Sequence, residues 1–251
     1  DEAKECFRKS LALDRTNVNV SKDLSFLQIQ TRELQGFVET RKLVLEQRPH
    51  TRANWVAYSA AQYLNGNYTA ASDALEKGSE YTNSQEVDIT GRIEDGELIM
   101  YHNQCLEKAG RIEEAIAHLE SNKPKIMDKN GYKIKMAELH QLCGKSAEAK
   151  QMWYKLVKTQ PDNYRFHCGL QTSILELSPE LSAEMFRLTR LDLPSTALHL
   201  SASQLDILRQ LYTKSNFESK VIKKIELTLY RGDEPEFPAV LDAYLRGNLT
   251  S

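Results

Sequence analysis

Two pairs of histidine and cysteine have the spacing that metal binding would need. His102 and Cys105 are three positions apart, and so are His140 and Cys143. On a helix this spacing places both side chains on one face, as two ligands of a zinc ion would require. No further ligand follows either pair at the spacing of a zinc site. Because the two pairs also hold comparable positions in successive repeats, we interpret them as packing positions and predict no metal site.

A phosphate-binding loop and a catalytic centre are not predicted either. A cofactor that carries a pyrophosphate needs a glycine-rich loop at the start of a helix, where backbone amides can bind the phosphates. Gly66, Gly110 and Gly144 are solitary, and the sequence contains no HExxH, GxSxG or P-loop motif. The pair Glu113-Glu114 falls at the polar start of a predicted helix, so we interpret it as solvated. We therefore predict no catalytic residue and no cofactor.

The two tryptophans could be binding aromatics or core residues. Trp55 takes the aromatic position near the start of a predicted first helix of the tetratricopeptide repeat, and Trp153 is the large apolar residue of the pattern described next. Large aromatic side chains at such positions fill the space between packed helices. We therefore predict that both tryptophans belong to the core.

The helices that position these residues are predicted from a recurring pattern of glycine, alanine and one large apolar residue. Glycine permits a tight connection between two helices, alanine five positions later lets their backbones approach, and the large residue four positions further on fills the adjacent groove. The pattern occurs three times, as Gly66, Ala71 and Leu75, as Gly110, Ala115 and Leu119, and as Gly144, Ala149 and Trp153. The sequence therefore predicts three helical hairpins.

The spacing of the hairpins indicates the kind of repeat. Gly110 and Gly144 are 34 residues apart, which is the period of a tetratricopeptide array. Gly66 and Gly110 are 44 residues apart, and we assign the ten extra residues to a longer loop or an extended helix end around residues 81–91. The predicted fold class is all-α: a tetratricopeptide-type, right-handed superhelical solenoid of helical hairpins.

Composition excludes several classes of partner. Charged residues make up 27% of the chain, and 33 Lys+Arg against 35 Asp+Glu leave a net charge of −2, which favours neither nucleic acid nor an anionic membrane as the main partner. No apolar run approaches the roughly 18 residues of a membrane span. The four cysteines form no CxxC pair. We predict that they are buried thiols and that the protein is cytoplasmic.

The chain is predicted to form two regions of one solenoid. Residues 1–163 would contain the tetratricopeptide-type repeats, beginning with a second helix over residues 3–14, and residues 164–251 would be degenerate helical repeats that continue the same solenoid. Apolar residues keep helical spacing over 164–177, 179–191, 203–212, 218–230 and 237–245. Residues 231–235 contain glycine and proline and are predicted to form a turn.

Several stretches resemble one protein family. The run Asp23–Gln30, followed by Glu39-Thr40-Arg41, Gln47-Arg48-Pro49 and Trp55, is similar in order and spacing to the large auxiliary subunit of the NatA N-terminal acetyltransferase. Further similar stretches are Tyr101–Gln104 before Gly110 and Ala115, Leu139–Ala149, Tyr154–Asn163, and Arg231-Gly232 followed by Pro235, Phe237 and Tyr244. The resemblance spans most of the chain and is weakest between Leu177 and Tyr230.

The resemblance implies a function that composition and spacing do not show. It implies a horseshoe of helical repeats that wraps a small catalytic acetyltransferase, docks near the ribosomal exit tunnel and helps to acetylate nascent chains. Because the family's subunit is much longer, this chain would be part of its N-terminal arm. We therefore expect a non-catalytic scaffold with the catalytic subunit and the ribosome as partners, and with no membrane or specific nucleic-acid sequence among them.

A peptide-binding tetratricopeptide adaptor or co-chaperone is the alternative. Capture of a C-terminal carboxylate would need paired lysine and asparagine on the inner side of a first helix. The helix that contains Trp55 offers Val56, Ala60 and Tyr63 instead. The adaptor stays as the second hypothesis, and a pull-down would separate the two.

The residues most suited to contact a partner lie on the first helices of the hairpins, on the side that does not enter the core. Apolar and amide groups together could hold a helix or an extended segment. Extending the repeat places six residues there, which are Lys22, Met100, Gln104, Ile134, Glu138 and Gln141.

Overall fold

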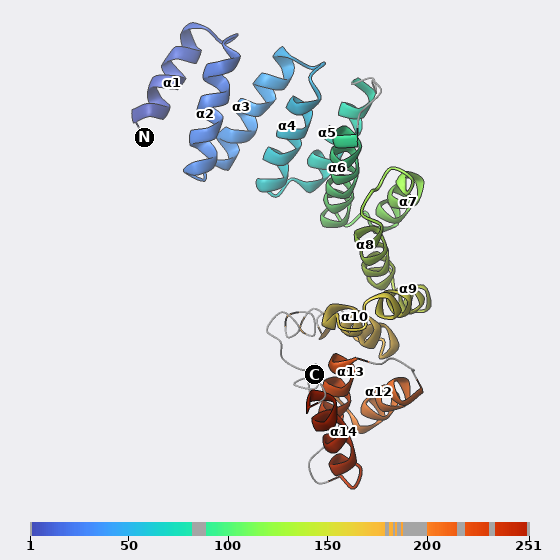
Figure 1. The fold of residues 1–251 in the computed structure, drawn as a ribbon. Helices are drawn as coiled ribbons and strands as arrows, with labels where there is room; N and C mark the ends of the chain where they lie inside the picture. Colours follow the sequence, from blue (N-terminus) through green and yellow to red (C-terminus); the bar gives the residue numbers. More distant parts are fainter. Residues whose placement is uncertain are drawn as a thin grey trace. The chain divides into compact units, whose positions relative to one another are not determined.

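In the computed structural model the described part of the chain is built from helices that follow one another along the sequence (Figure 1). The structure describes all residues except 1, 82–88, 179–180, 183, 185–186, 188–199, 215–218, 231–233 and 250–251. Every regular element among the described residues is a helix, which confirms the all-α class. The helices are α1 (Glu2–Leu13), α2 (Val18–Gln30), α3 (Leu34–Gln47), α4 (Arg52–Leu64), α5 (Tyr68–Tyr81), α6 (Ile89–Lys108), α7 (Ile112–Asn122), α8 (Lys129–Leu142), α9 (Ser146–Thr159), α10 (Tyr164–Ile174), α12 (Ala202–Lys214), α13 (Lys220–Thr228) and α14 (Phe237–Leu249).

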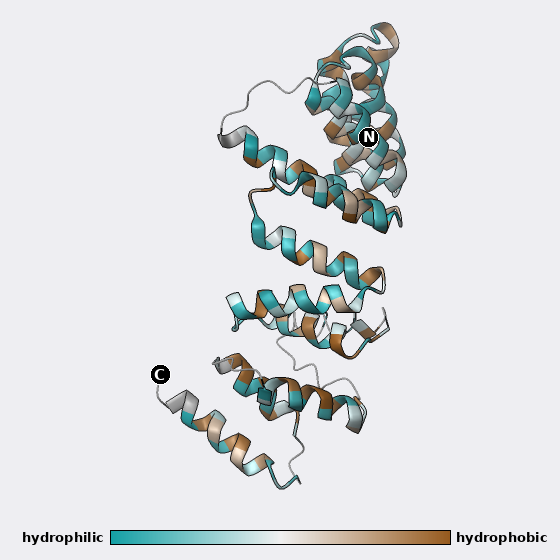
Figure 2. Cartoon of the chain, turned by 90° about the vertical axis from the view of Figure 1, so that its right-hand side faces the viewer, coloured by the Kyte–Doolittle hydropathy of each residue, from teal (hydrophilic) through white to brown (hydrophobic). Residues whose placement is uncertain are grey.

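The helices are grouped into two compact units, residues 1–127 and residues 128–251. In the first unit each helix from α1 to α7 packs against the next, and in the second unit α8, α9 and α10 do the same. Apolar and polar residues are interspersed along the helices (Figure 2), and the buried apolar residues of neighbouring helices form the clusters between them. This sequential packing of antiparallel hairpins is the tetratricopeptide-type arrangement that the sequence predicts.

The predicted glycine turns are confirmed and share one geometry. Gly66, Gly110 and Gly144 have φ angles of 83°, 77° and 71°, a left-handed conformation that costs glycine little. At Gly110 the preceding helix ends in a Schellman motif, because Arg111 N donates to Leu106 O at 3.0 Å and Gly110 N donates to Glu107 O at 3.0 Å. The motif ends the first helix and directs the chain straight into the second.

Two further turns use the same geometry without glycine. Arg32 and Glu176 are the non-glycine residues with positive φ in the described part of the chain, at 56° and 47°. Arg32 lies 34 residues before Gly66, and Glu176 lies 32 residues after Gly144. Glu33 N donates to Gln28 O at 2.8 Å, which is the same closing bond as in the glycine turns. The repeat therefore includes the α2–α3 hairpin before the glycine turns, and the same type of turn also ends α10.

Opposite substitutions at these turns are expected to have opposite effects. Gly110→Ala should lower the free energy of unfolding by about 1 kcal/mol, because a β-carbon is strained at positive φ although the space around it is open. Arg32→Gly should raise it by up to about 1 kcal/mol, because glycine removes that strain. Urea unfolding followed by circular dichroism would measure both. A lower free energy of unfolding for both variants would show that backbone strain at positive φ does not determine these effects.

The alanines of the repeat lie where the two helices of a hairpin cross. Ala71, Ala115 and Ala149 are fully buried, as predicted. Polar side chains of the first helix donate hydrogen bonds to the backbone carbonyl oxygens of these alanines. Ser59 Oγ donates to Ala71 O at 2.7 Å, and Asn103 Nδ2 donates to Ala115 O at 2.6 Å. Because the alanine side chain is only a methyl group, the two helices can approach closely enough for these hydrogen bonds to form.

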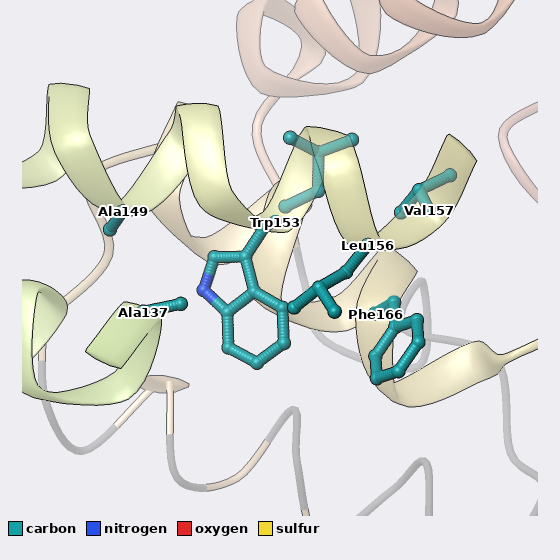
Figure 3. Close-up of a cluster of buried hydrophobic side chains, with 7 residues drawn as sticks. Ala137, Ala149, Trp153, Leu156, Val157 and Phe166 are labelled. Atoms are coloured by element: carbon teal, nitrogen blue, oxygen red, sulfur yellow. The ribbon is translucent and has the colours of Figure 1, made fainter. Parts of the chain in front are cut away.

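The core residues between hairpins are the large members of the repeat. In the first unit Ala71 and Leu75 of α5 pack with Cys105 of α6, and in the second unit Trp153 of α9 packs with Ala137 of α8 and Phe166 of α10 (Figure 3). Each second helix therefore joins its own hairpin to the next first helix. The predicted core role of Trp153 is confirmed.

Two predictions about burial need correction. Trp55 is half-buried rather than enclosed, because its ring stacks on Tyr81 at the edge of the hairpin, 5.4 Å between centroids, while Nε1 donates to Pro49 O at 2.7 Å. Cys105 and Cys168 are buried, but Cys143 is half-buried at a helix end and Cys6 is exposed on α1. The prediction of four buried thiols is therefore wrong for Cys6.

The ten extra residues of the 44-residue step are partly explained. Helix α6 has 20 residues where α8 has 14, so an extended helix accounts for part of them. The rest of the predicted insertion, residues 82–88, lies outside the described residues, as do most of the predicted helix 179–191 and residues 231–233 of the predicted turn. The predicted helices over 3–14, 164–177, 203–212, 218–230 and 237–245 correspond to α1, α10, α12, α13 and α14. The division at residue 163 stays a prediction.

Candidate protein-interaction surface

On the first helices α2, α4, α6 and α8, the positions ten, six and three residues before the left-handed turn residue lie on one face. We call this the first-helix face. Its members are Lys22, Phe26 and Ile29 on α2, Val56, Ala60 and Tyr63 on α4, Met100, Gln104 and Glu107 on α6, and Ile134, Glu138 and Gln141 on α8. The six residues that the sequence assigns to partner contact all belong to it.

The structure places these six residues on three helices in two units. Lys22 on α2 and Met100 on α6 are half-buried, and Gln104 is exposed. Ile134, Glu138 and Gln141 follow one another along α8 in the second unit and are half-buried. The structure therefore brings the α8 residues together and the two α6 residues together, with Lys22 on a separate helix of the first unit.

On α6 the first-helix face is tied to the neighbouring first helix. Gln104 Nε2 donates to the hydroxyl of Tyr63 on α4 at 2.9 Å, and the ring of Tyr63 lies 5.8 Å from that of Tyr101. Burial raises the pKa of Tyr101, so this phenol stays neutral and can donate a hydrogen bond. The result is a fixed, mostly uncharged stretch of surface that spans α4 and α6.

On α8 the predicted residues also contact the next first helix. Glu138 forms an ion pair with Arg165 of α10 at 2.5 Å, and Gln141 Nε2 donates to Thr172 Oγ1 at 2.7 Å. Ile134 packs against the core cluster around Trp153. Part of each side chain is therefore engaged within the fold, and only the remaining half-exposed part can meet a partner.

Sequence reasoning missed the most exposed apolar part of this face. Phe26 and Ile29 on α2 are 57% and 36% exposed, and they hold the positions of Gln104 and Gln141 in the repeat. The signal that could have found them is the 34-residue step back from Gly66, which ends at Arg32. Extending the repeat reached Lys22 on α2, but an arginine was not recognised as a turn residue, so Phe26 and Ile29 were not assigned to the same face.

The histidine–cysteine pairs contact their neighbours within the repeat. His102 Nε2 and Ser72 Oγ share a hydrogen bond of 3.0 Å, and the His102 ring meets His118 edge-to-face with centroids 4.5 Å apart. Cys105 is enclosed instead beside Ser59 and Tyr101, and burial raises its thiol pKa. The two members of this pair thus face different partners, which supports the packing interpretation.

Burial also sets the charge state of these histidines. Desolvation, with smaller contributions from His118 and Arg111, lowers the pKa of His102 to about 4. Burial lowers the pKa of His118 as well. Both rings are therefore neutral at neutral pH, as packing side chains should be.

The adjacent glutamates behave as predicted for a solvated helix start. Glu113 and Glu114 are both exposed, and Arg111 donates to Glu114 at 3.0 Å through Nε and 2.5 Å through Nη2. This hydrogen bonding lowers the pKa of Glu114, which keeps it ionised.

In the part of the chain that the structure describes, no helix is both long and apolar enough to cross a membrane.

Comparison with known families identifies the chain. The family described as "N-terminal acetyltransferase A, auxiliary subunit" matches residues 93–251, well over half of the sequence. The chain belongs to this family of NatA auxiliary subunits. The resemblance seen in the sequence motifs of residues 23–55 is therefore accompanied by an independent match over residues 93–251.

Relatives of this NatA auxiliary subunit are much longer. The chain is 32% identical over 255 residues to the N-terminal acetyltransferase A complex auxiliary subunit NAA15 of Arabidopsis thaliana, covering 99% of this chain and 26% of that protein. It is 34% identical over 175 residues to human N-alpha-acetyltransferase 16, NatA auxiliary subunit, covering 69% of this chain and 20% of that protein. The chain thus spans about a quarter or less of the curated relatives that it matches.

A solved structure of the family shares the fold. The structure entitled "Structure of Naa15/Naa10 bound to HypK-THB" matches 98% of this chain and 33% of its own chain, with a TM-score of 0.71 and 25% identity. The similarity covers both units of the NatA auxiliary chain, so the helical repeats described above are those of the family.

Proposed function

We propose that this chain is a non-catalytic scaffold segment of an N-terminal protein acetyltransferase complex that acts on nascent chains at the ribosome in the cytoplasm. The observation that carries the proposal is membership of the NatA auxiliary-subunit family, together with a fold that matches a chain solved with Naa10. Its partner would be a small catalytic acetyltransferase. The auxiliary subunit would supply surface and position, and the catalytic subunit would supply the chemistry.

The geometry supports a binding role for the first-helix face. Its apolar and amide groups are held in place by contacts between neighbouring first helices, such as Gln104 with Tyr63 and Gln141 with Thr172. Side chains fixed in this way lose little conformational freedom when a partner binds. Lys22, Met100, Gln104, Ile134, Glu138 and Gln141 remain the proposed partner-facing residues.

Co-expression tests the scaffold role directly. The full-length protein, with and without residues 1–251, is expressed with its catalytic acetyltransferase and analysed by size-exclusion chromatography and a peptide acetylation assay. We expect co-elution and activity to depend on the full-length protein, and a partial loss on deletion would measure the share of this segment. Absence of any association with the full-length protein would reject the scaffold and favour the peptide-binding adaptor.

A charge substitution on the first-helix face is expected to weaken assembly if that face contacts a protein partner. Met100→Arg places an unpaired cation on α6 without touching a hydrogen bond, and a buried uncompensated charge in an interface costs several kcal/mol. Glu120→Arg is the matched control, because Glu120 is exposed on the second helix α7. We expect less co-elution with the catalytic subunit for Met100→Arg and no change for Glu120→Arg. Equal co-elution of both variants would show that Met100 does not contact the partner.

A further inference from the structure

Arg41 occupies a position that is apolar in the other repeats. It lies nine residues after the turn residue Arg32, where the later hairpins have Leu75, Leu119 and Trp153. Those three side chains are at most 6% exposed and form the core between hairpins. The α2–α3 hairpin therefore directs a guanidinium group toward a place where the fold otherwise puts a hydrophobic side chain.

The guanidinium of Arg41 lies over two aromatic rings. Its central carbon lies 5.6 Å from the centroid of Phe26 on α2 and 5.5 Å from that of Phe37 on α3. Nε is buried and makes no hydrogen bond to any described residue, and no described carboxylate pairs with the group. Such cation–π contacts orient the cation but replace little of the lost hydration.

The surface around Arg41 is both apolar and basic. Phe26 and Ile29 are exposed on α2, and Lys22 lies one helical turn before Phe26 on the same face. Lys22 forms no ion pair with a described residue. We call Lys22, Phe26, Ile29 and Arg41 the α2 patch. Two cations that lack a carboxylate partner thus flank an exposed aromatic ring.

We propose that the α2 patch binds a protein segment in which an acidic side chain stands next to a large apolar one. The acidic group would accept hydrogen bonds from Arg41, and the apolar neighbour would cover Phe26 and Ile29. A carboxylate is the group that a planar, oriented guanidinium binds best, because two parallel N–H donors match its two oxygens. The proposal concerns a site of its own and does not depend on which acetyltransferase the chain assembles with.

Single-stranded nucleic acid is a weaker fit to the same surface. Bases could stack on Phe26, but a phosphate backbone needs a track of several cations. The α2 patch has two, and exposed Asp23 and Glu39 lie close to them in sequence on the same two helices. These acidic residues would repel a long phosphate backbone. A single acidic side chain of a peptide requires only one or two cations, which the α2 patch provides.

The test uses the immobilised full-length protein and two matched pools of short synthetic peptides. One pool combines Asp or Glu with Leu or Phe, and the other has Asn or Gln in place of each acid. We expect the acidic pool to bind about tenfold more tightly than the amide pool, because a charge-assisted hydrogen bond accounts for that ratio. Equal binding of the two pools would overturn the proposal.

Three variants locate the site. Arg41→Leu restores the apolar residue of the other repeats, so we expect it to unfold at the same temperature as wild type or higher and to lose the acidic preference. Arg41→Gln should lose the preference as well. Lys42→Gln removes one charge from an exposed neighbour on α3 and should keep the preference in full.

Two results would refute the α2 patch. Retention of the tenfold preference in a folded Arg41→Leu protein would place the acid-binding site elsewhere, and displacement of bound peptide by a single-stranded oligoribonucleotide at lower concentration than free peptide would indicate nucleic acid instead. Co-elution of Arg41→Leu with the catalytic acetyltransferase is expected to be unchanged. Failure of this proposal is therefore distinguishable from failure of the scaffold role.

Discussion

Replacing Trp153 by alanine is expected to destabilise the second unit by about 3–5 kcal/mol, as for other large aromatic residues truncated in a core. Trp153 is fully buried and joins α9 to both α8 and α10, so its loss leaves a cavity that touches two hairpins. Hydrogen exchange followed by mass spectrometry would measure the effect, with faster exchange expected in α8, α9 and α10. Unchanged protection of these helices would show that Trp153 does not carry the packing between them.

The cause of this large effect can be isolated through Gly169. A β-carbon at Gly169 would lie 2.3 Å from Cε2 of Trp153 and 2.4 Å from Cδ2, and the buried ring has no room to move. Gly169→Ala should therefore cost about 1–3 kcal/mol by overpacking, although alanine is the better helix former by about 1 kcal/mol. In the Trp153→Ala background the same change should be neutral or stabilising, because the obstruction is gone.

Gly96→Ala is the control for this pair of variants. Gly96 is also inside a helix, but a β-carbon there would meet its nearest neighbour, Lys125 O, at 3.4 Å, an ordinary contact. We expect Gly96→Ala to leave the free energy of unfolding unchanged or slightly higher. If the changes in free energy of unfolding for Gly169→Ala and Trp153→Ala simply add in the double variant, contact with the Trp153 ring is not the reason why position 169 is glycine.

Periodicity was sufficient to predict the hairpins that have glycine turns. Glycine at positive φ and alanine at a helix crossing are required by sterics, so residue type alone marks Gly110 and Ala115. Residue type does not mark the turns at Arg32 and Glu176, because a left-handed turn tolerates other residues at a cost in free energy. Only the 34-residue step back from Gly66 points to Arg32.

The binding surface was less predictable than the fold. A position on the first-helix face follows from the register, but its availability depends on contacts with the next hairpin, such as Glu138 with Arg165. Those contacts involve residues about 30 positions away and have no local pattern. The exposed ring of Phe26 likewise meets Arg41, which is 15 positions away on α3. Periodicity therefore predicts the face, and only packing shows which part of it is open.

Acidification is expected to destabilise the first unit through His102. The ordinary pKa of 6.5 applies in the unfolded chain, and burial lowers the pKa to about 4 in the folded protein. Protons therefore bind more tightly to the unfolded chain, so the contribution of His102 is fully present above pH 6.5 and is lost as the pH falls from 6.5 toward 4. From these two values the loss is about 2 kcal/mol at pH 5.

The measurement compares wild type with His102→Gln at pH 7.5 and pH 5. Glutamine can keep a hydrogen bond to Ser72 but cannot titrate, so its free energy of unfolding should fall by about 2 kcal/mol less on acidification than that of wild type. His50→Gln is the control, because His50 is exposed. Hydrogen exchange of α5, α6 and α7 reports on the first unit, whereas tryptophan fluorescence would mix Trp55 with Trp153 of the second unit. Identical acid sensitivity of wild type and His102→Gln would mean that the partly exposed ring is solvated well enough to accept a proton without unfolding. The α5–α6–α7 contact around it would then have to be looser than the Ser72 hydrogen bond and the edge-to-face contact with the His118 ring indicate.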